Sequence, residues 1–254
     1  MGQAVDYAFL HGAGEGGWLW DDLIAAMRLQ TDGAFGGALA LDVPGCGEKA
    51  GRDVEPLGPD EVAAELIGDI EAAGFKDVVL VGHSMAGTIL PRMVAQRPDL
   101  FRRLIYVACA APAPGQTASE IFGTSRRGEN PDEIGWPIDP RTCSAEELFK
   151  VLFWTDTTPA QTEMFRRRLH ENRWPAPTQA ARDWTYDHLD ATPSTYVVCL
   201  QDMSAPARWQ EVFAERLRCQ RLVRIDAGHQ AMVTRPHALA EALRIEAALQ
   251  EPRE

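Results

Sequence analysis

The chain has 254 residues, of which 45% are hydrophobic, enough to build the core of one large α/β domain or two small ones. Its 37 acidic and 25 basic residues give a net charge of −12, which argues against nucleic acid and anionic membranes as partners. The five cysteines are scattered and form no CxxC pair, so we expect neither a disulfide framework nor a metal site. The first apolar stretch, residues 7–10, is too short for a signal or a membrane span, and we expect a cytoplasmic location.

Strand-like and helix-like segments alternate along the chain. Apolar runs bounded by turn residues predict strands at 5–10, 38–43, 77–81, 104–108, 194–200 and 221–225. Helical spacing of apolar residues predicts helices at 18–29, 59–73, 86–96, 206–217 and 236–249, with Pro91 expected to kink or weaken the third of them. This alternation indicates an α/β fold with a doubly wound, mostly parallel sheet.

The alternation breaks over residues 112–192, which contain many prolines and four of the seven tryptophans. Helix-like pieces are predicted at 145–154 and 159–173, with little strand. An insertion of this size after the fourth strand predicts a helical cap over the carboxyl edge of the sheet, where ligands bind in open α/β folds. We therefore divide the chain into a core, residues 1–111 and 193–254, and a cap, residues 112–192.

Residues 78–90, VVLVGHSMAGTIL, place Ser84 between a buried strand and a helix start. Small neighbours allow a sharp, strained turn that leaves the Ser84 hydroxyl projecting above the sheet, the arrangement known as a nucleophile elbow. Here Ala86 takes the place of the second glycine of the motif, and Gly87 follows it. The alternative is a glycine-rich turn with a bystander serine.

A nucleophilic serine requires a base and an acid, and in the elbow architecture they follow it in the order acid, then histidine. His229 lies directly after the last predicted strand, on a short loop that can carry the imidazole over Ser84. Asp202 follows the fifth strand with one residue between and is the predicted acid. Asp226 is the rival, but it lies on the same loop as His229 and would have to reach back.

The oxyanion formed during acyl transfer needs two backbone N–H donors. One is expected from Met85, the residue after the nucleophile, and the other from Ala13 on the glycine-rich loop after the first strand. A phosphate-binding role for this loop is disfavoured, because neither Gly-x-Gly-x-x-Gly nor a Gly-Lys-Ser/Thr ending is present. We expect no cofactor.

With these residues in place, the chain resembles the α/β-hydrolases, and most closely the branch of plant methylesterases and hydroxynitrile lyases with its bacterial relatives. The matching motifs lie at 9–13, 16–20, 81–87, 196–202 and 228–232 and leave the cap unmatched. The resemblance implies a serine hydrolase that forms an acyl-enzyme intermediate. Lyases of this branch have a threonine and a lysine where this chain has Gly12 and Gln230, which favours the hydrolase.

The predicted substrate is a carboxylic ester of a small apolar or aromatic molecule. An amide or carbamate hydrolase with the same triad is one alternative, and a lyase-type or non-catalytic ligand-binding member of the fold is another. Relatives are often dimers, so a homodimer is kept as an option. We expect the substrate pocket to include the first loop and several cap aromatics, although such rings can also simply pack the cap onto the sheet: His11, Gly12, Trp136, Phe153, Trp154 and Trp184.

Overall fold

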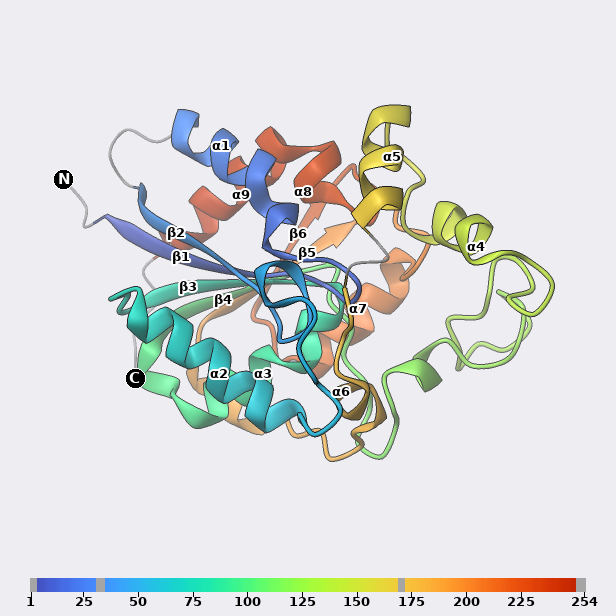
Figure 1. Ribbon diagram of the computed structural model, residues 1–254, viewed down its shortest axis with the longest axis horizontal. Coiled ribbons are helices and arrows are strands. Elements are labelled where there is room, and N and C mark those ends of the chain that lie inside the picture. Colours follow the sequence, from blue (N-terminus) through green and yellow to red (C-terminus); the bar gives the residue numbers. More distant parts are fainter. Residues whose placement is uncertain (1–3, 31–34, 169–171, 250–254) are drawn as a thin grey trace.

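The computed structural model describes residues 4–30, 35–168 and 172–249. Within this part of the chain, six strands form one parallel sheet in the order β2-β1-β3-β4-β5-β6 (Figure 1). The strands are β1 (Val5–Leu10), β2 (Phe35–Leu41), β3 (Val78–His83), β4 (Phe101–Val107), β5 (Ser194–Cys199) and β6 (Arg221–Ile225). The predicted α/β fold class is confirmed. Because all strands run the same way, the loops that follow them gather at one edge of the sheet.

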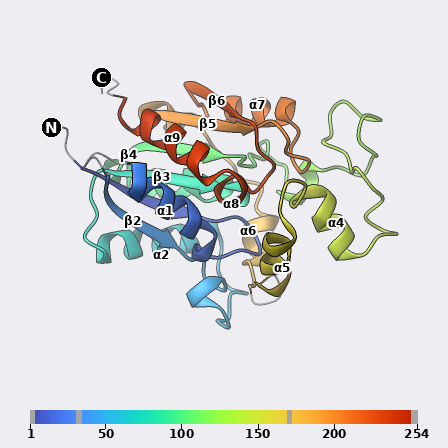
Figure 2. The ribbon, with the colours of Figure 1, turned by 90° about the horizontal axis from the view of Figure 1, so that it is seen from above.

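Helices cover both faces of the sheet (Figures 1 and 2). On one face lie α1 (Asp21–Gln30), α8 (Ala231–Thr234) and α9 (Pro236–Ala247). On the other face lie α2 (Pro59–Ala72), α3 (Leu90–Gln96) and α7 (Ala207–Arg216). A sheet covered in this way has two apolar layers, one under each set of helices.

The side chains of the central strands alternate between these two layers. In β1, Ala8 and Leu10 pack towards α2 and α3, whereas Tyr7 and Phe9 pack towards α1 and α9. All six residues of β3 are buried, as expected for the continuous apolar run that precedes Ser84. No described helix is both long enough and apolar enough to cross a lipid bilayer.

Local sequence explains α2, the clearest of the predicted helices. Val62, Leu66 and Ile70 recur at helical spacing and are fully buried against the sheet. Pro59 stands in the first turn, where its missing N–H leaves no carbonyl unpaired, and Gly74 ends the helix with a left-handed φ of 77°.

Several predicted bounds differ from the structure. The second and fourth strands each begin three residues earlier than predicted, at Phe35 and Phe101, and the helix predicted from residue 18 begins as α1 at Asp21, after a 3-10 turn. The predicted continuous helix at 86–96 is wrong: a 3-10 turn, Ser84–Thr88, precedes α3, which begins at Leu90. Pro91 therefore lies in the first turn of α3, where a proline is tolerated, and kinks nothing.

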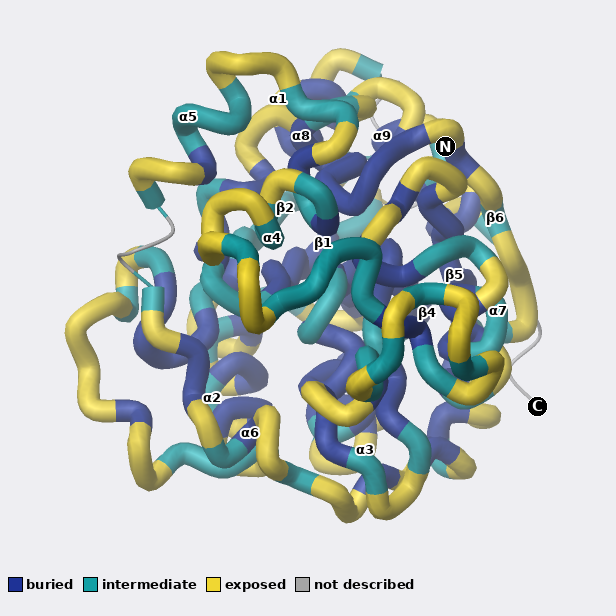
Figure 3. The backbone as a smooth tube through the Cα atoms, turned by 90° about the vertical axis from the view of Figure 1, so that its right-hand side faces the viewer, coloured by how far each residue is buried: buried dark blue, intermediate teal, exposed yellow. Residues whose placement is uncertain are grey.

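The segment between β4 and β5 contains three α-helices, α4 (Ala145–Leu152), α5 (Pro159–Arg168) and α6 (Ala176–Ala180), within its described residues. Ser144 and Glu147 form a reciprocal capping box at the start of α4. The predicted helix at 159–173 is present to Arg168; residues 169–171 lie outside the described residues. Figure 3 shows α4 as largely exposed or half-buried, in contrast to the buried central strands β4 and β5.

The turn at Ser84 is strained and crowded. Ser84 has a φ of 53°, a left-handed conformation that a residue with a Cβ adopts only at a cost. Gly12 passes so close that a Cβ there would lie 2.8 Å from Ser84 Cβ, and a Cβ at Gly82 would lie 3.1 Å from Ala86 Cβ. At Gly87, a Cβ would collide with the backbone carbonyl of Ala110. The predicted tight, strained turn is therefore present, and it requires glycine at the neighbouring positions, where a side chain would not fit.

Gly87→Ala should lower the free energy of unfolding by about 1–3 kcal/mol, because the added methyl group must displace backbone. Gly68→Ala is the matched control: Gly68 is exposed inside α2 with nothing near its missing Cβ, so alanine there should stabilise by about 0.5–1 kcal/mol. Urea unfolding of both variants measures the expected loss of stability in the first and the expected gain in the second. A Gly87→Ala protein as stable as its parent would show that the turn is not crowded.

Candidate active site

A cavity of about 190 Å³ lies at the carboxyl edge of the sheet and brings the predicted residues together. Ser84, Met85, Ala13 and His229 all contribute to its wall. The rest of the wall is largely apolar, with aromatic rings from the segment between β4 and β5 and from the first loop: Trp18, Phe122, Phe149, Phe153, Trp154 and Phe165. The hydroxyl and the imidazole thus face one space rather than two.

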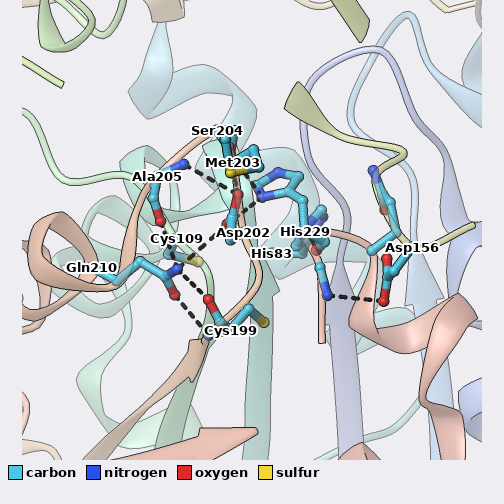
Figure 4. Close-up of polar contacts among 12 residues, drawn as sticks. His83, Cys109, Asp156, Cys199, Asp202, Met203, Ser204, Ala205, Gln210 and His229 are labelled. Atoms are coloured by element: carbon cyan, nitrogen blue, oxygen red, sulfur yellow. Dashed lines mark hydrogen bonds and ion pairs between the residues drawn. The ribbon is translucent and has the colours of Figure 1, made fainter. Parts of the chain in front are cut away.

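The carboxylate of Asp202 lies behind the His229 ring, as predicted (Figure 4). Asp202 Oδ2 is 2.7 Å from His229 Nδ1, and both side chains are buried. The rival Asp226 is exposed and accepts a hydrogen bond from Gln201 instead. Within the described residues no hydrogen bond joins Ser84 to the His229 ring; such contacts often tighten only when substrate is bound.

Ser204, which the sequence did not indicate, sets the tautomer of His229. The Ser204 hydroxyl donates its single proton to Asp202 Oδ1 at 2.9 Å, and its oxygen is 2.9 Å from His229 Nδ1. The Nδ1 proton is therefore shared between Asp202 and Ser204, and Nε2 keeps the lone pair that a general base needs.

Gln210 holds the loop that carries Asp202. Its amide donates to the carbonyls of Cys199 at 2.9 Å and Ala205 at 2.7 Å, and its oxygen accepts the Cys199 N–H at 2.9 Å. Ser204 N–H and Ala205 N–H also donate to Asp202 Oδ1. Donors on its own turn thus hold Oδ1 of the carboxylate, while Oδ2 faces the histidine at 2.7 Å and accepts a longer bond from the Gln210 amide at 3.5 Å.

Charge and burial act in opposite directions on His229. Burial alone lowers the pKa of an imidazole, but the Asp202 carboxylate, through its charge and its hydrogen bond, outweighs burial and raises the pKa of His229 above its ordinary value. The charge of Glu15 acts in the same direction. The site therefore favours the charged imidazolium that forms when the histidine takes a proton.

The loop after β1 presents Ala13 to the cavity. The Gly12 N–H is occupied by Glu15 Oε2 at 3.0 Å and is not free for a ligand. The Gly12 carbonyl accepts from His11 Nδ1 at 2.7 Å, and in a trans peptide the next N–H, that of Ala13, points the opposite way. His11 Nε2 accepts the Val43 N–H at 3.1 Å, so both ring nitrogens are engaged and the ring is neutral.

Four residues expected in the substrate pocket lie outside the wall of this cavity. His11 is fully buried under the first loop, and Gly12 is covered by Ser84 and Glu15. Trp136 supports the wall from behind, with its ring stacked 4.8 Å from Phe122 and its N–H on a backbone carbonyl. Trp184 packs in the apolar layer on the side of α2, α3 and α7, and its indole N–H donates to the Gln116 carbonyl. Phe153 and Trp154 do line the cavity, as expected.

Two further carboxylates reach the loops of the site. Asp156, between α4 and α5, accepts the Gly228 N–H at 2.9 Å, one residue before His229 (Figure 4). Glu15 lies in the cavity wall and accepts from Gln230 at 2.7 Å. Glu15 directly follows the predicted oxyanion loop, residues 11–14, and this place in the sequence could have indicated it as a site residue. Nothing in the sequence around Asp156 indicated its contact with the loop of His229.

The chain belongs to the family described as Alpha/beta hydrolase family, whose pattern matches residues 8–242. Norfluorocurarine synthase 1 from Strychnos is 24% identical over 257 residues, which cover 95% of this chain and 94% of that protein. The probable esterase PIR7A from Oryza sativa subsp. indica is 32% identical over 127 residues, 50% of this chain and 47% of that protein.

Among solved structures, the methylesterase MES16 from Arabidopsis aligns with a TM-score of 0.72 and 20% sequence identity, covering 97% of this chain and 100% of that one. At this level of identity the likeness shows the fold. The family match confirms the resemblance to the α/β-hydrolases that the motifs indicated.

Gln210→Leu should lower the free energy of unfolding by about 2–4 kcal/mol, because a side chain of similar size leaves the polar backbone groups of Cys199 and Ala205 buried without partners. Gln96→Leu makes the same chemical change at an exposed site on α3 and should stay within about 0.5 kcal/mol of the parent. Thermal and urea unfolding compare the two. Equal stabilities would mean that Gln210 does not hold the loop.

Proposed function

We propose that the protein is a serine hydrolase that cleaves carboxylic esters of small, neutral, apolar or aromatic molecules. The observation that carries this proposal is the buried Asp202–His229 pair at 2.7 Å, placed behind a cavity that also contains Ser84. Relatives named as esterases, in rice and in Nocardioides, support ester cleavage as the reaction class.

In the proposed reaction, His229 Nε2 takes the Ser84 proton and the Ser84 oxygen attacks the ester carbonyl carbon. The backbone N–H groups of Met85 and Ala13 stabilise the oxyanion, and loss of one such donor typically costs about 3 kcal/mol of barrier. His229 then gives its proton to the leaving alcohol. Water, deprotonated by the same imidazole, releases the acid from Ser84.

The size and polarity of the cavity support a small neutral substrate. An apolar cavity of roughly 150 Å³ is large enough for benzene, so 190 Å³ suits one ring with a short ester group. No arginine or lysine lines the cavity among the described residues, and Glu15 adds a carboxylate. An anionic acyl group would be buried beside these walls without a counter-charge. We propose that the segment between β4 and β5 acts as the cap that encloses this space.

The surroundings of Gln230 support hydrolysis over lyase chemistry. The branch resemblance associates lyases with a lysine at this position. Here the Gln230 amide is held by Glu15 at 2.7 Å, and no described wall residue supplies a lysine in its place.

Ser84→Ala should reduce the hydrolysis of a short aryl ester by at least about 10³-fold, because the acyl-enzyme can no longer form. Ser204→Ala is the matched control, since Ser204 also lines the cavity and Asp202 still holds the His229 tautomer without it; this variant should retain most of the activity. A fluorophosphonate should label the parent and the Ser204→Ala variant. Labelling of the Ser84→Ala variant, or undiminished turnover by it, would refute the nucleophile.

For substrate charge, methyl benzoate should exceed its para-carboxylate analogue about 10- to 100-fold in kcat/KM.

The pH dependence of kcat/KM should follow His229, which must be neutral to accept a proton. Because Asp202 raises the pKa of His229, the rate should rise with pH through a value above the ordinary histidine range. Asp202→Asn removes the charge that raises the pKa of His229. The rising limb of the pH profile should therefore move to lower pH, while kcat falls on the order of 10⁴-fold. Stopped assays across a pH series measure both effects. A limb that stays in place would exclude Asp202 as the partner of the base.

A further inference from the structure

Glu15 is a carboxylate in the cavity wall that the proposed mechanism does not use. Its side chain lies on the loop after β1, and the residue is only 8% exposed. Oε2 accepts the Gly12 N–H at 3.0 Å and lies 3.2 Å from His83 Nδ1, while Oε1 accepts from Gln230 Nε2 at 2.7 Å. One buried carboxylate therefore contacts three of the loops that bring the proposed groups to the cavity, those that carry Ala13, Ser84 and His229.

The partners of His83 require a proton on its Nε2 and a second proton between its Nδ1 and Glu15. His83 Nε2 is 3.0 Å from the backbone carbonyl oxygen of His229, which can only accept, so Nε2 carries a proton. His83 Nδ1 faces a carboxylate oxygen, and two lone pairs at 3.2 Å would repel each other. Glu15 and His83 must therefore share one further proton.

Glu15 accepts hydrogen bonds from the Gly12 N–H and from the Gln230 amide, which favours its ionised form and so puts that proton on His83. Burial acts to raise the pKa of Glu15, but the His83 charge and the hydrogen bonds from His83 and Gln230 outweigh it and bring the pKa of Glu15 to about 2. The Gly12 N–H adds another donor that favours the ionised form. Besides Glu15, the titratable groups facing His83 are the His229 ring, with centroids 4.6 Å apart, and the neutral His11.

The geometry points to a buried carboxylate–imidazolium pair, Glu15 with doubly protonated His83, that positions the base loop for catalysis. His83 Nε2–H holds the His229 carbonyl, and Glu15 holds the next side chain, Gln230. The negative charge of Glu15 also offsets the repulsion between His83 and His229 when His229 takes a proton. Glu15 and His83 are positioning residues, and their effect on catalysis rests on the proposed esterase function.

A neutral side chain of the same shape cannot satisfy this set of partners. In Glu15→Gln, an amide NH₂ facing a singly protonated His83 leaves the Gly12 N–H without its acceptor. The opposite amide orientation keeps Gly12 satisfied but requires a proton on Nδ1, and a neutral His83 then loses its bond to the His229 carbonyl. The variant should therefore fold around the same shape and lose the position of the base or of the oxyanion loop.

The test is nitrogen NMR of the histidine side chains in the full-length protein at neutral pH, with His83→Asn used to assign the His83 signals. Both ring nitrogens of His83 should have the chemical shifts of protonated nitrogen in the parent protein. In Glu15→Gln, one of them should move to the range of a bare nitrogen. A bare Nδ1 in the parent overturns the pair, whether or not the variant folds.

Kinetics test the positioning role separately. Glu15→Gln should lower kcat about 10²-fold with KM changed less than about 3-fold, because the base is displaced while the apolar wall is kept. Glu241→Gln removes the same charge at an exposed site on α9 and should match the parent. Unchanged kcat in Glu15→Gln overturns the positioning role. A parent protein without esterase activity would refute the proposed function, and the NMR result would then decide the ion pair alone.

Discussion

The left-handed backbone at Ser84 is the constraint on which the rest of the site depends. A residue with a side chain adopts a φ of 53° only where the surroundings enforce it. Here β3 enforces it from one side and the 3-10 turn from the other, while Gly12, Gly82 and Gly87 leave the space that neighbouring side chains would have filled. As a result, Ser84 lies at the carboxyl edge of the sheet in the wall of the cavity, which His229 also lines from another loop.

Around that hydroxyl, the site is a set of buried polar groups whose orientation is decided by their hydrogen-bond partners. Asp202 is held by N–H groups of its own turn and by Ser204, so only one direction is left for the bond to His229. His11 acts in the same way on the loop after β1, because its bond to the Gly12 carbonyl fixes the orientation of the peptide group that carries the Ala13 N–H. Burial makes each of these bonds matter, since an unsatisfied group there would be costly.

The segment between β4 and β5 shapes the cavity. Five of its aromatic side chains line the wall, and the volume of about 190 Å³ is that of a small ring-bearing molecule. The same segment reaches the loop of His229 through Asp156, which accepts the Gly228 N–H. A change in the wall can therefore also change the position of the His229 imidazole.

The sequence by itself was enough to predict the α/β fold and the residues that meet at one edge of the sheet. Ser84 and Asp202 follow the fully buried strands β3 and β5, and His229 follows the more exposed β6. Parallel strands bring their carboxyl ends together whatever the details of packing. Their catalytic role stays a prediction. Only the tertiary structure decided that Glu15 lies against Gln230, 215 positions away, and which aromatic rings face the cavity rather than the core. Periodicity and turn signals are local properties of a chain, whereas contacts between loops depend on how whole layers pack.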